Sequence, residues 1–145
     1  MKKTVLFTLV SSVLVTTFVQ AEQPRSFSSD KTIQSQFNKI SLNQELPSWI
    51  KQGGTTSETK TVKITGKEYL VFNSCKPHDC AGEQIATIYS PQTKIMASVF
   101  SKTDEKNATQ ELKWMSNNKI SIEQKTILLS ALTGGLANYP QKFNF

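Results

Sequence analysis

Chemically reactive side chains gather in the stretch SCKPHDCAGE, which holds both cysteines and the single histidine of the 145-residue chain. Cys75, His78 and Cys80 lie within six residues, with Pro77 between them and Asp79 beside the histidine. Three kinds of chemistry use these residue types: a metal site, a redox or catalytic centre, and a small rigid peptide loop that is inserted into a partner.

A metal site fits the spacing poorly. Structural zinc sites usually bring together two separated pairs of ligands, so that the chain wraps around a tetrahedral ion. Here Cys75, His78, Asp79 and Cys80 would have to supply four ligands from six consecutive residues. Such a site would strain the backbone, and both thiols would have to stay reduced. We therefore predict no metal and no cofactor.

A catalytic or redox centre is also disfavoured. Side chains of sequence neighbours such as His78 and Asp79 rarely point at one another, and no second carboxylate or nucleophile has a recognisable spacing to them. Redox exchange favours a Cys-x-x-Cys motif at a helix N-terminus, whereas four residues separate these cysteines. We therefore expect a protein that is not an enzyme.

A disulfide-closed loop is the third interpretation. The ring would enclose Lys76, Pro77, His78 and Asp79. Closing it restricts the unfolded chain by roughly 2 kcal/mol, and the proline fixes one more φ angle. A loop restricted in this way has already lost much of the entropy that binding costs. Two hypotheses stay open from the residues alone: the loop presents Lys76, His78 and Asp79 to a partner, or the disulfide merely staples a hairpin.

The start of the chain predicts export. Two lysines precede a charge-free apolar and hydroxyl-rich stretch at residues 5–19, and VQA then provides the small residues of a signal-peptidase site. The apolar run is short for a membrane span, so an uncleaved anchor is the weaker alternative. We expect residues 1–21 to be a removed signal peptide and residues 22–145 to form one domain. In an oxidising compartment, two cysteines most often form one disulfide.

Charge excludes one class of partner. The formal net charge is +6, and two of these positive charges belong to the leader lysines. The remaining charges are scattered, without a basic block or a basic stripe with interleaved aromatic residues, so we expect no nucleic-acid binding. The sequence also lacks a glycine-rich phosphate loop and an internal repeat.

The first segment of the expected domain has helical periodicity. Its apolar positions are Ile33, Phe37 and Ile40. Ser29 or Asp30 would cap an amphipathic helix here. We expect Pro47 to end this helix, the Gly53-Gly54 pair to form a turn, and Trp49 to anchor the segment in the core, where we also place Trp114 and Phe143.

Strands are predicted next. The segments TKTVKIT, EYLVFNS, EQIATIYS and KIMASVFS have the composition and bounding turns of strands. Their short connections favour an antiparallel meander. The cysteine ring falls between the second and third of these segments, so we expect it at the rim of the sheet.

The last third is predicted to be helical. TDEKNATQELKWMSN spaces Ala108, Leu112 and Met115 as a helix would, and SIEQKTILLSALTGG opens with a Ser121…Gln124 capping box and closes on glycine. The second helix would cover one face of the sheet with Ile127, Leu128, Ala131 and Leu132. The predicted fold class is α+β: a single-domain sandwich of an antiparallel β-sheet with helices packed on one face.

The hexapeptide CKPHDC resembles the signature loop of the Ivy family, the periplasmic inhibitors of vertebrate-type (c-type) lysozyme in Gram-negative bacteria. The likeness extends to LPSWIKQGG, VFSKTDEK and ILLSALTGGLANYPQKFNF, and so covers most of the chain from about Phe37 onward. The resemblance implies an α+β sandwich and a periplasmic, non-enzymatic inhibitor that protects peptidoglycan. It also implies homodimers and control of the cell's own lytic transglycosylases, both of which are associated with the family.

The resemblance also implies roles for the residues of the loop. The disulfide would join Cys75 and Cys80, and His78 would enter the active-site cleft of the lysozyme and meet its two catalytic carboxylates. The inserted loop would be completed by Lys76, Pro77 and Asp79. Family lysozyme targets are strongly basic, and the chain is net positive as well, so affinity would have to come from local burial rather than long-range steering.

An imidazole suits this role chemically. A retaining glycosidase holds its two carboxyl groups about 5–5.5 Å apart. The two ring nitrogens of His78 could hydrogen-bond to a group on each side, and a protonated ring would make these bonds charge-assisted. A neutral ring against a protonated glutamic acid is the alternative.

Overall fold

The computed structural model describes residues 27–145, so the expected signal peptide, residues 1–21, lies outside the described residues. Over the part that is described, no helix is long and apolar enough to cross a membrane. The helices are α1 (Lys31–Ile40), α2 (Ser48–Gln52), α3 (Ile122–Leu132) and α4 (Gly135–Asn138), followed by the 3-10 turn η1 (Pro140–Phe143). The strands are β1 (Thr55–Thr56), β2 (Lys60–Ile64), β3 (Lys67–Lys76), β4 (Asp79–Tyr89), β5 (Met96–Asp104) and β6 (Thr109–Ser116).

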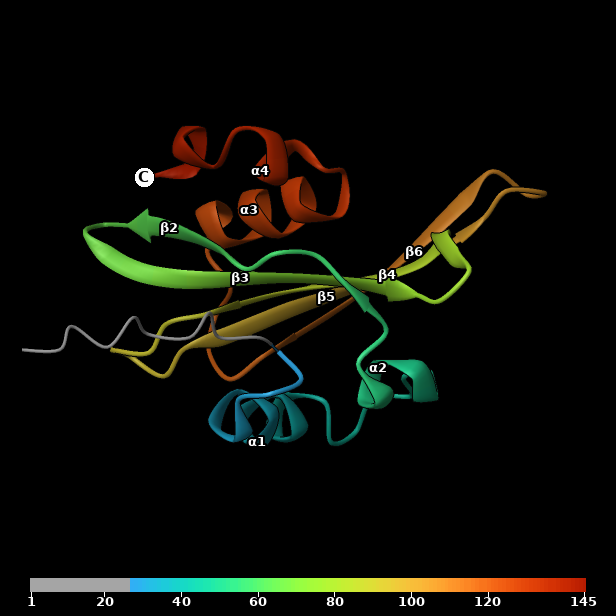
Figure 1. Cartoon of the computed structure of the whole chain (residues 1–145), viewed down its shortest axis with the longest axis horizontal. Coiled ribbons are helices and arrows are strands. Elements are labelled where there is room, and N and C mark those ends of the chain that lie inside the picture. Colours follow the sequence, from blue (N-terminus) through green and yellow to red (C-terminus); the bar gives the residue numbers. More distant parts are fainter. Residues whose placement is uncertain (1–26) are drawn as a thin grey trace, which may run out of the picture.

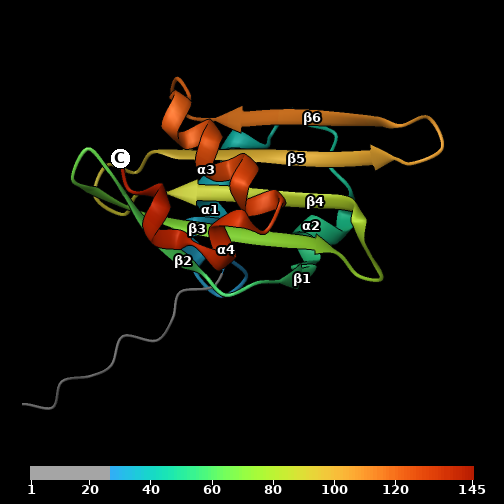
Figure 2. The same cartoon turned by 90° about the horizontal axis from the view of Figure 1, so that it is seen from above.

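The strands form one antiparallel sheet. Strands β3 to β6 follow one another as a meander, and β1 and β2 both pair with β3 along its other side (Figure 2). The α+β class and the antiparallel sheet predicted from the sequence are confirmed. The four predicted strand segments correspond to β2, β3, β4 and β5, whereas β1 and β6 were not predicted.

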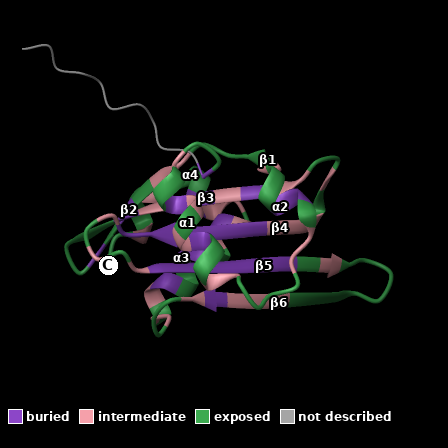
Figure 3. Ribbon diagram, turned by 90° about the horizontal axis from the view of Figure 1, so that it is seen from below, coloured by how far each residue is buried: buried purple, intermediate pink, exposed green. Residues whose placement is uncertain are grey.

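Helices cover both faces of the sheet, so the prediction that they pack on one face is wrong. Helices α3 and α4 lie on one side, and α1 and α2 lie on the other (Figure 1). Neighbouring strand residues alternate between two hydrophobic clusters: Val71 and Ala86 face α3, while Phe72 and Ile85 face α1. The middle of the sheet is therefore buried on both faces, and the strand residues next to the β5–β6 turn are mostly exposed (Figure 3).

Helix α1 begins where its sequence predicts but ends earlier than predicted. Asp30 caps it, since the Asp30 carboxylate accepts hydrogen bonds from the amides of Thr32 (2.8 Å) and Ile33 (3.2 Å). The helix ends at Ile40, well before Pro47, because its apolar stripe ends there and the next apolar side chain, Leu42, is 80% exposed.

The prediction that Pro47 ends the first helix is therefore wrong. Pro47 instead precedes α2 as its N-cap, where a fixed φ angle and a missing amide donor cost nothing. The predicted turn at Gly53-Gly54 is confirmed, with positive φ angles of 101° and 53°. Trp49 is buried, as predicted.

The segment TDEKNATQELKWMSN was predicted to be a helix, and this prediction is wrong: it completes the β5–β6 hairpin. Leu112 and Trp114 pack on the cluster beneath α3, whereas Met115 is buried in the cluster on the opposite face. In a sheet that is covered on both faces, residues three positions apart, such as Leu112 and Met115, can both lose solvent contact, which imitates the spacing of a helix. Ala108 is exposed in the turn before β6, so its place in the helical spacing does not reflect burial.

Helix α3 forms as its sequence predicts. Ser121 Oγ accepts a hydrogen bond from the Gln124 amide (3.2 Å), and Gln124 Oε1 accepts one from the Ser121 amide (3.0 Å). The helix is followed by Gly134 with a φ of 80°. Its predicted core face is confirmed, with Leu132 partly buried and the others buried: Ile127, Leu128 and Ala131.

Candidate functional site

The CKPHDC stretch forms the tip of the β3–β4 hairpin. Lys76 pairs with Asp79, so Pro77 and His78 form a two-residue turn, and both are exposed. The tip lies at one end of the sheet, next to the end of the β5–β6 hairpin (Figure 2). The predicted position of the ring, between two strands at the rim of the sheet, is confirmed.

A disulfide closes the tip. Cys75 and Cys80 are bonded, with their Cα atoms 4.8 Å apart. The strand register shifts at the same place: Cys75 pairs with Gln84, but Lys76 pairs with Asp79, so residues 80–83 have no partner in β3, although Glu83 still pairs with Lys102 of β5. The turn is therefore separated from the regular sheet by an irregular segment, and other contacts must orient it.

His78 has an uncommon backbone conformation. Its φ is 65°, in the left-handed region. Proline at the first central position and a positive φ at the second are the pattern of a type II turn, in which glycine or asparagine usually occupies the second position. Holding another residue there costs about 1–2 kcal/mol. The surroundings must supply this energy, and strain of this kind is concentrated at functional sites.

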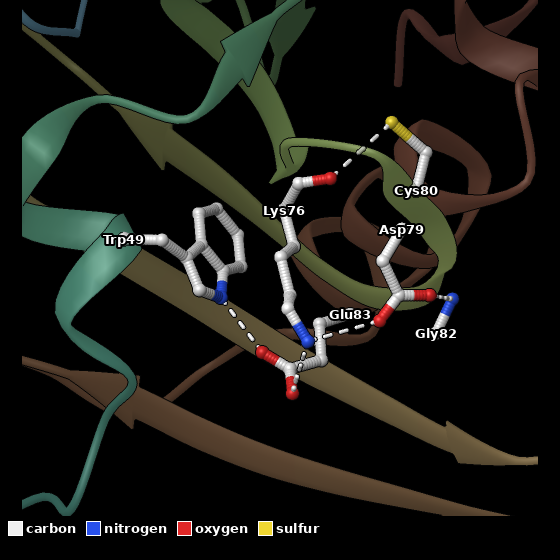
Figure 4. Close-up of polar contacts among 6 residues, drawn as sticks. All are labelled: Trp49, Lys76, Asp79, Cys80, Gly82 and Glu83. Carbon is white, nitrogen blue, oxygen red and sulfur yellow. Dashed lines mark hydrogen bonds and ion pairs between the residues drawn. The ribbon is translucent and has the colours of Figure 1, made fainter.

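Lys76 and Asp79 brace the turn from within. The Lys76 ammonium lies 3.1 Å from one carboxylate oxygen of Asp79 and 3.6 Å from Glu83 Oε1, and the other Asp79 oxygen accepts a hydrogen bond from the Gly82 amide at 3.1 Å (Figure 4). The hydrogen bond to Asp79 and the charge of Glu83 raise the pKa of Lys76. Lys76 and Asp79, which precede and follow the Pro77-His78 turn, are thus paired with one another, and each side chain is about 40% exposed.

Glu83 connects the turn to helix α2. Its Oε2 accepts a hydrogen bond from the indole Nε1 of Trp49 at 2.7 Å, while its Oε1 faces Lys76 (Figure 4). The Glu83 side chain is 14% exposed, and Trp49 is 8% exposed. Sequence analysis placed Trp49 in the core, which is confirmed, but it missed Glu83. No local signal joins two residues that lie 34 positions apart.

Two glycines allow the parts of the site to approach closely. A Cβ atom on Gly54 would lie 2.7 Å from the Cys75 carbonyl oxygen and 2.8 Å from the Trp49 ring. A Cβ atom on Gly82 would overlap the Asp79 carboxylate. Only a residue without a side chain fits either position while these neighbours stay in place.

The disulfide limits the chemistry that the ring can perform. Both thiols are consumed by the disulfide, so neither is available as a metal ligand or a nucleophile. Within residues 27–145, no three histidine, cysteine or acidic side chains are grouped so that they could hold a metal ion. The exposed imidazole of His78, presented on a covalently closed and braced turn, is the group that is free to contact another molecule.

The sequence of the chain was compared with those of known protein families and proteins. The family described as inhibitor of vertebrate lysozyme (Ivy) matches residues 32–126. A protein of Escherichia coli K12 named inhibitor of vertebrate lysozyme is 37% identical over 142 residues, which cover 95% of this chain and 90% of that protein. A Pseudomonas aeruginosa protein of the same name is 30% identical over 46 residues, or 31% of this chain and 30% of that protein.

Proposed function

The chain belongs to the Ivy family, and on that premise we propose that it inhibits c-type lysozyme by inserting the tip of the β3–β4 hairpin into the active-site cleft. Members of this family are inhibitor proteins and not enzymes. In our proposal His78 is the blocking residue, and the Cys75–Cys80 disulfide fixes the loop in the shape that enters the cleft.

One observation supports this function most strongly. His78 is exposed at the outermost turn of a hairpin, in a left-handed conformation that a disulfide, a proline and an ion pair maintain. A histidine with no partner to contact would gain nothing from this arrangement, because glycine or asparagine would form the same turn with less strain. The geometry therefore favours a presented loop over a simple staple.

The proposed mechanism is occlusion. A retaining glycosidase separates its two carboxyl groups by about 5–5.5 Å, and an imidazole between them could hydrogen-bond to both at about 2.8 Å. The ring would then occupy the position of the scissile bond. Because the turn is already rigid, binding would order few further side chains, and most of the contact energy would appear as affinity.

The proposed site of action is the periplasm, where the inhibitor would protect peptidoglycan. The predicted signal peptide would deliver residues 22–145 to an oxidising compartment in which the disulfide persists. The family resemblance also predicts two further partners, a second copy of the chain and the lytic transglycosylases of the same cell.

The test is a titration of c-type lysozyme in a cell-wall lysis assay with oxidised residues 22–145. We expect inhibition to be complete at one mole of protein per mole of enzyme. His78→Ala should weaken inhibition at least about 30-fold, which corresponds to a binding hot spot of 2 kcal/mol. Lys119→Ala, an exposed substitution beyond the other end of β6, is the control and should inhibit like the wild type.

Two results would contradict the proposal. One is the absence of inhibition by the folded, oxidised wild-type protein. The other is full inhibition by the His78→Ala variant, which would show that the loop does not act through its imidazole.

A further inference from the structure

We infer that Glu83, which lies outside the CKPHDC loop, is a positioning residue that aims the loop by joining Lys76 to Trp49 of helix α2. The inference rests on the proposed function, since it explains how the body of the protein orients the inhibitory turn. It adds two residues, Glu83 and Trp49, to those that determine inhibition.

The disulfide alone does not orient the turn. It joins the two ends of the ring and so limits the internal shape of the loop. The direction of the ring relative to the sheet is a separate matter, because none of residues 80–83 pairs with β3, and of these four only Glu83 has a strand partner, Lys102 of β5. An irregular segment of this kind can act as a hinge unless side chains bridge it.

Glu83 provides that bridge. Its two carboxylate oxygens have different partners: Oε2 accepts the Trp49 indole hydrogen bond, and Oε1 faces the Lys76 ammonium (Figure 4). Trp49 is buried among the side chains beneath the sheet, with its ring against Gly54, and so it cannot follow a moving loop. Lys76, in turn, is paired with Asp79 on the far side of the turn. The chain of contacts runs from the core to both residues that flank the Pro77-His78 pair.

The low solvent exposure of Glu83 strengthens its interactions with Trp49 and Lys76. The Glu83 side chain is 14% exposed, so its charge is poorly hydrated and depends on its two partners. Glu58 and Lys60 form a contrasting pair at 2.6 Å, in which the Glu58 side chain is 79% exposed. An exposed pair of that kind contributes little, because water competes for both charges.

The experiment compares Glu83→Gln with the matched control Glu58→Gln. The glutamine at position 83 keeps its size and can still accept the Trp49 hydrogen bond, but it loses the charge that attracts Lys76. We expect Glu83→Gln to weaken lysozyme inhibition about fivefold, as the loss of one partly exposed ion pair would. Its melting temperature should stay close to that of the wild type, and Glu58→Gln should change neither quantity.

A double-mutant cycle separates positioning from general stability. If Glu83 acts through Lys76, the pair Lys76→Met and Glu83→Gln should weaken inhibition no more than Lys76→Met alone. Trp49→Phe, which retains an aromatic ring but has no donor, should reproduce the loss of inhibition seen for Glu83→Gln. Wild-type inhibition by Glu83→Gln, or a fully additive cycle, would overturn the inference.

A measurement without lysozyme keeps this inference distinct from the proposed function. The imidazole signals of the single histidine report directly on the turn in the free protein. Glu83→Gln should shift or broaden them, and Glu58→Gln should leave them unchanged. If the wild type fails to inhibit lysozyme but these signals respond, the proposed function is wrong and the positioning role stands. If inhibition holds but the signals do not respond, the positioning role is wrong.

Discussion

Two hairpins reach the same end of the sheet, and they are stabilised in different ways. The β5–β6 turn is closed by its own residues: Asp104 accepts hydrogen bonds from the amides of Lys106 (3.1 Å) and Asn107 (3.3 Å) and from the side-chain amide of Asn107 (2.7 Å). The β3–β4 turn is held by a disulfide, an ion pair and a contact with a buried tryptophan of another element.

Each turn contains a non-glycine residue in the left-handed region, so strain alone does not distinguish them. The residue is Ala108 in the β5–β6 turn, with a φ of 50°, and His78 in the β3–β4 turn, with a φ of 65°. Alanine presents a single methyl group, and local hydrogen bonds suffice there. Histidine presents an imidazole, and its turn is held by the disulfide, by the Lys76–Asp79 ion pair and by the hydrogen bond between Glu83 and Trp49. The comparison shows that long-range bracing, and not a strained residue, distinguishes the β3–β4 turn from the β5–β6 turn.

The largest effect should come from glycine substitutions in the two turns. Glycine adopts a positive φ without strain, so His78→Gly and Ala108→Gly should each raise the free energy of unfolding by about 1 kcal/mol. Only His78→Gly should lose inhibition, at least about 30-fold. Thermal unfolding and lysozyme titration of both variants check this. Equal losses of inhibition would show that the two hairpins share the binding role.

An intermediate effect should follow the removal of the disulfide. The variant Cys75→Ser/Cys80→Ser lacks a closure that restricts the unfolded chain by roughly 2 kcal/mol, and its turn can sample other shapes. We expect about tenfold weaker inhibition, with the domain still folded by circular dichroism. Reduction of the wild type should give the same result. Unchanged inhibition after verified reduction would show that the brace made by Lys76, Asp79 and Glu83 suffices.

The smallest effect should appear at alkaline pH. Pairing with Asp79 and the charge of Glu83 raise the pKa of Lys76 in the folded protein. The stabilisation is therefore fully present below the unfolded value of about 10.4 and is lost as the pH rises through the folded pKa. The melting temperature of the wild type should fall over this range more than that of Lys76→Met. If the melting temperatures of the wild type and Lys76→Met depend on pH in the same way, the Lys76 ammonium has no role in bracing the turn.

The β5–β6 turn should show the opposite dependence. The side-chain and backbone hydrogen bonds from Asn107 lower the pKa of Asp104. Its contribution is present above the unfolded value of about 3.9 and is lost as the pH falls through the folded pKa. The wild type should therefore be more stable than Asp104→Asn at neutral pH, and this difference should disappear as the solution is acidified; thermal unfolding of both proteins over this pH range checks whether the two turns rely on separate charges.

The features that could be predicted from the sequence are those that depend on residues close together in the chain. The capping residues Asp30 and Ser121, the core face of α3 and the closed ring at a strand connection all depend on residues close together in the chain. The second covered face was not predicted, although in the structure residues 85–89 are buried without alternation, as in strands that are covered on both sides.

The rest depends on contacts that spacing does not reveal. Strand β6 was predicted to be a helix because Leu112 and Met115, which pack on opposite faces of the sheet, are spaced as they would be on one face of a helix. The Trp49–Glu83 hydrogen bond joins α2 to β4 only after the sheet has formed. The role of the loop was predicted from family resemblance, because its residues alone left a binding loop and a structural staple open.

The most direct test of the account follows the single histidine into the complex. Residues 22–145, isotope-labelled and without a polyhistidine tag, contain one imidazole, so its nuclear magnetic resonance signals belong to His78. On titration with unlabelled c-type lysozyme, we expect these signals to move to one new position, and the change to be complete at a ratio of one to one. Imidazole signals that stay in place while the two proteins form a complex would contradict the claim that His78 occupies the active site.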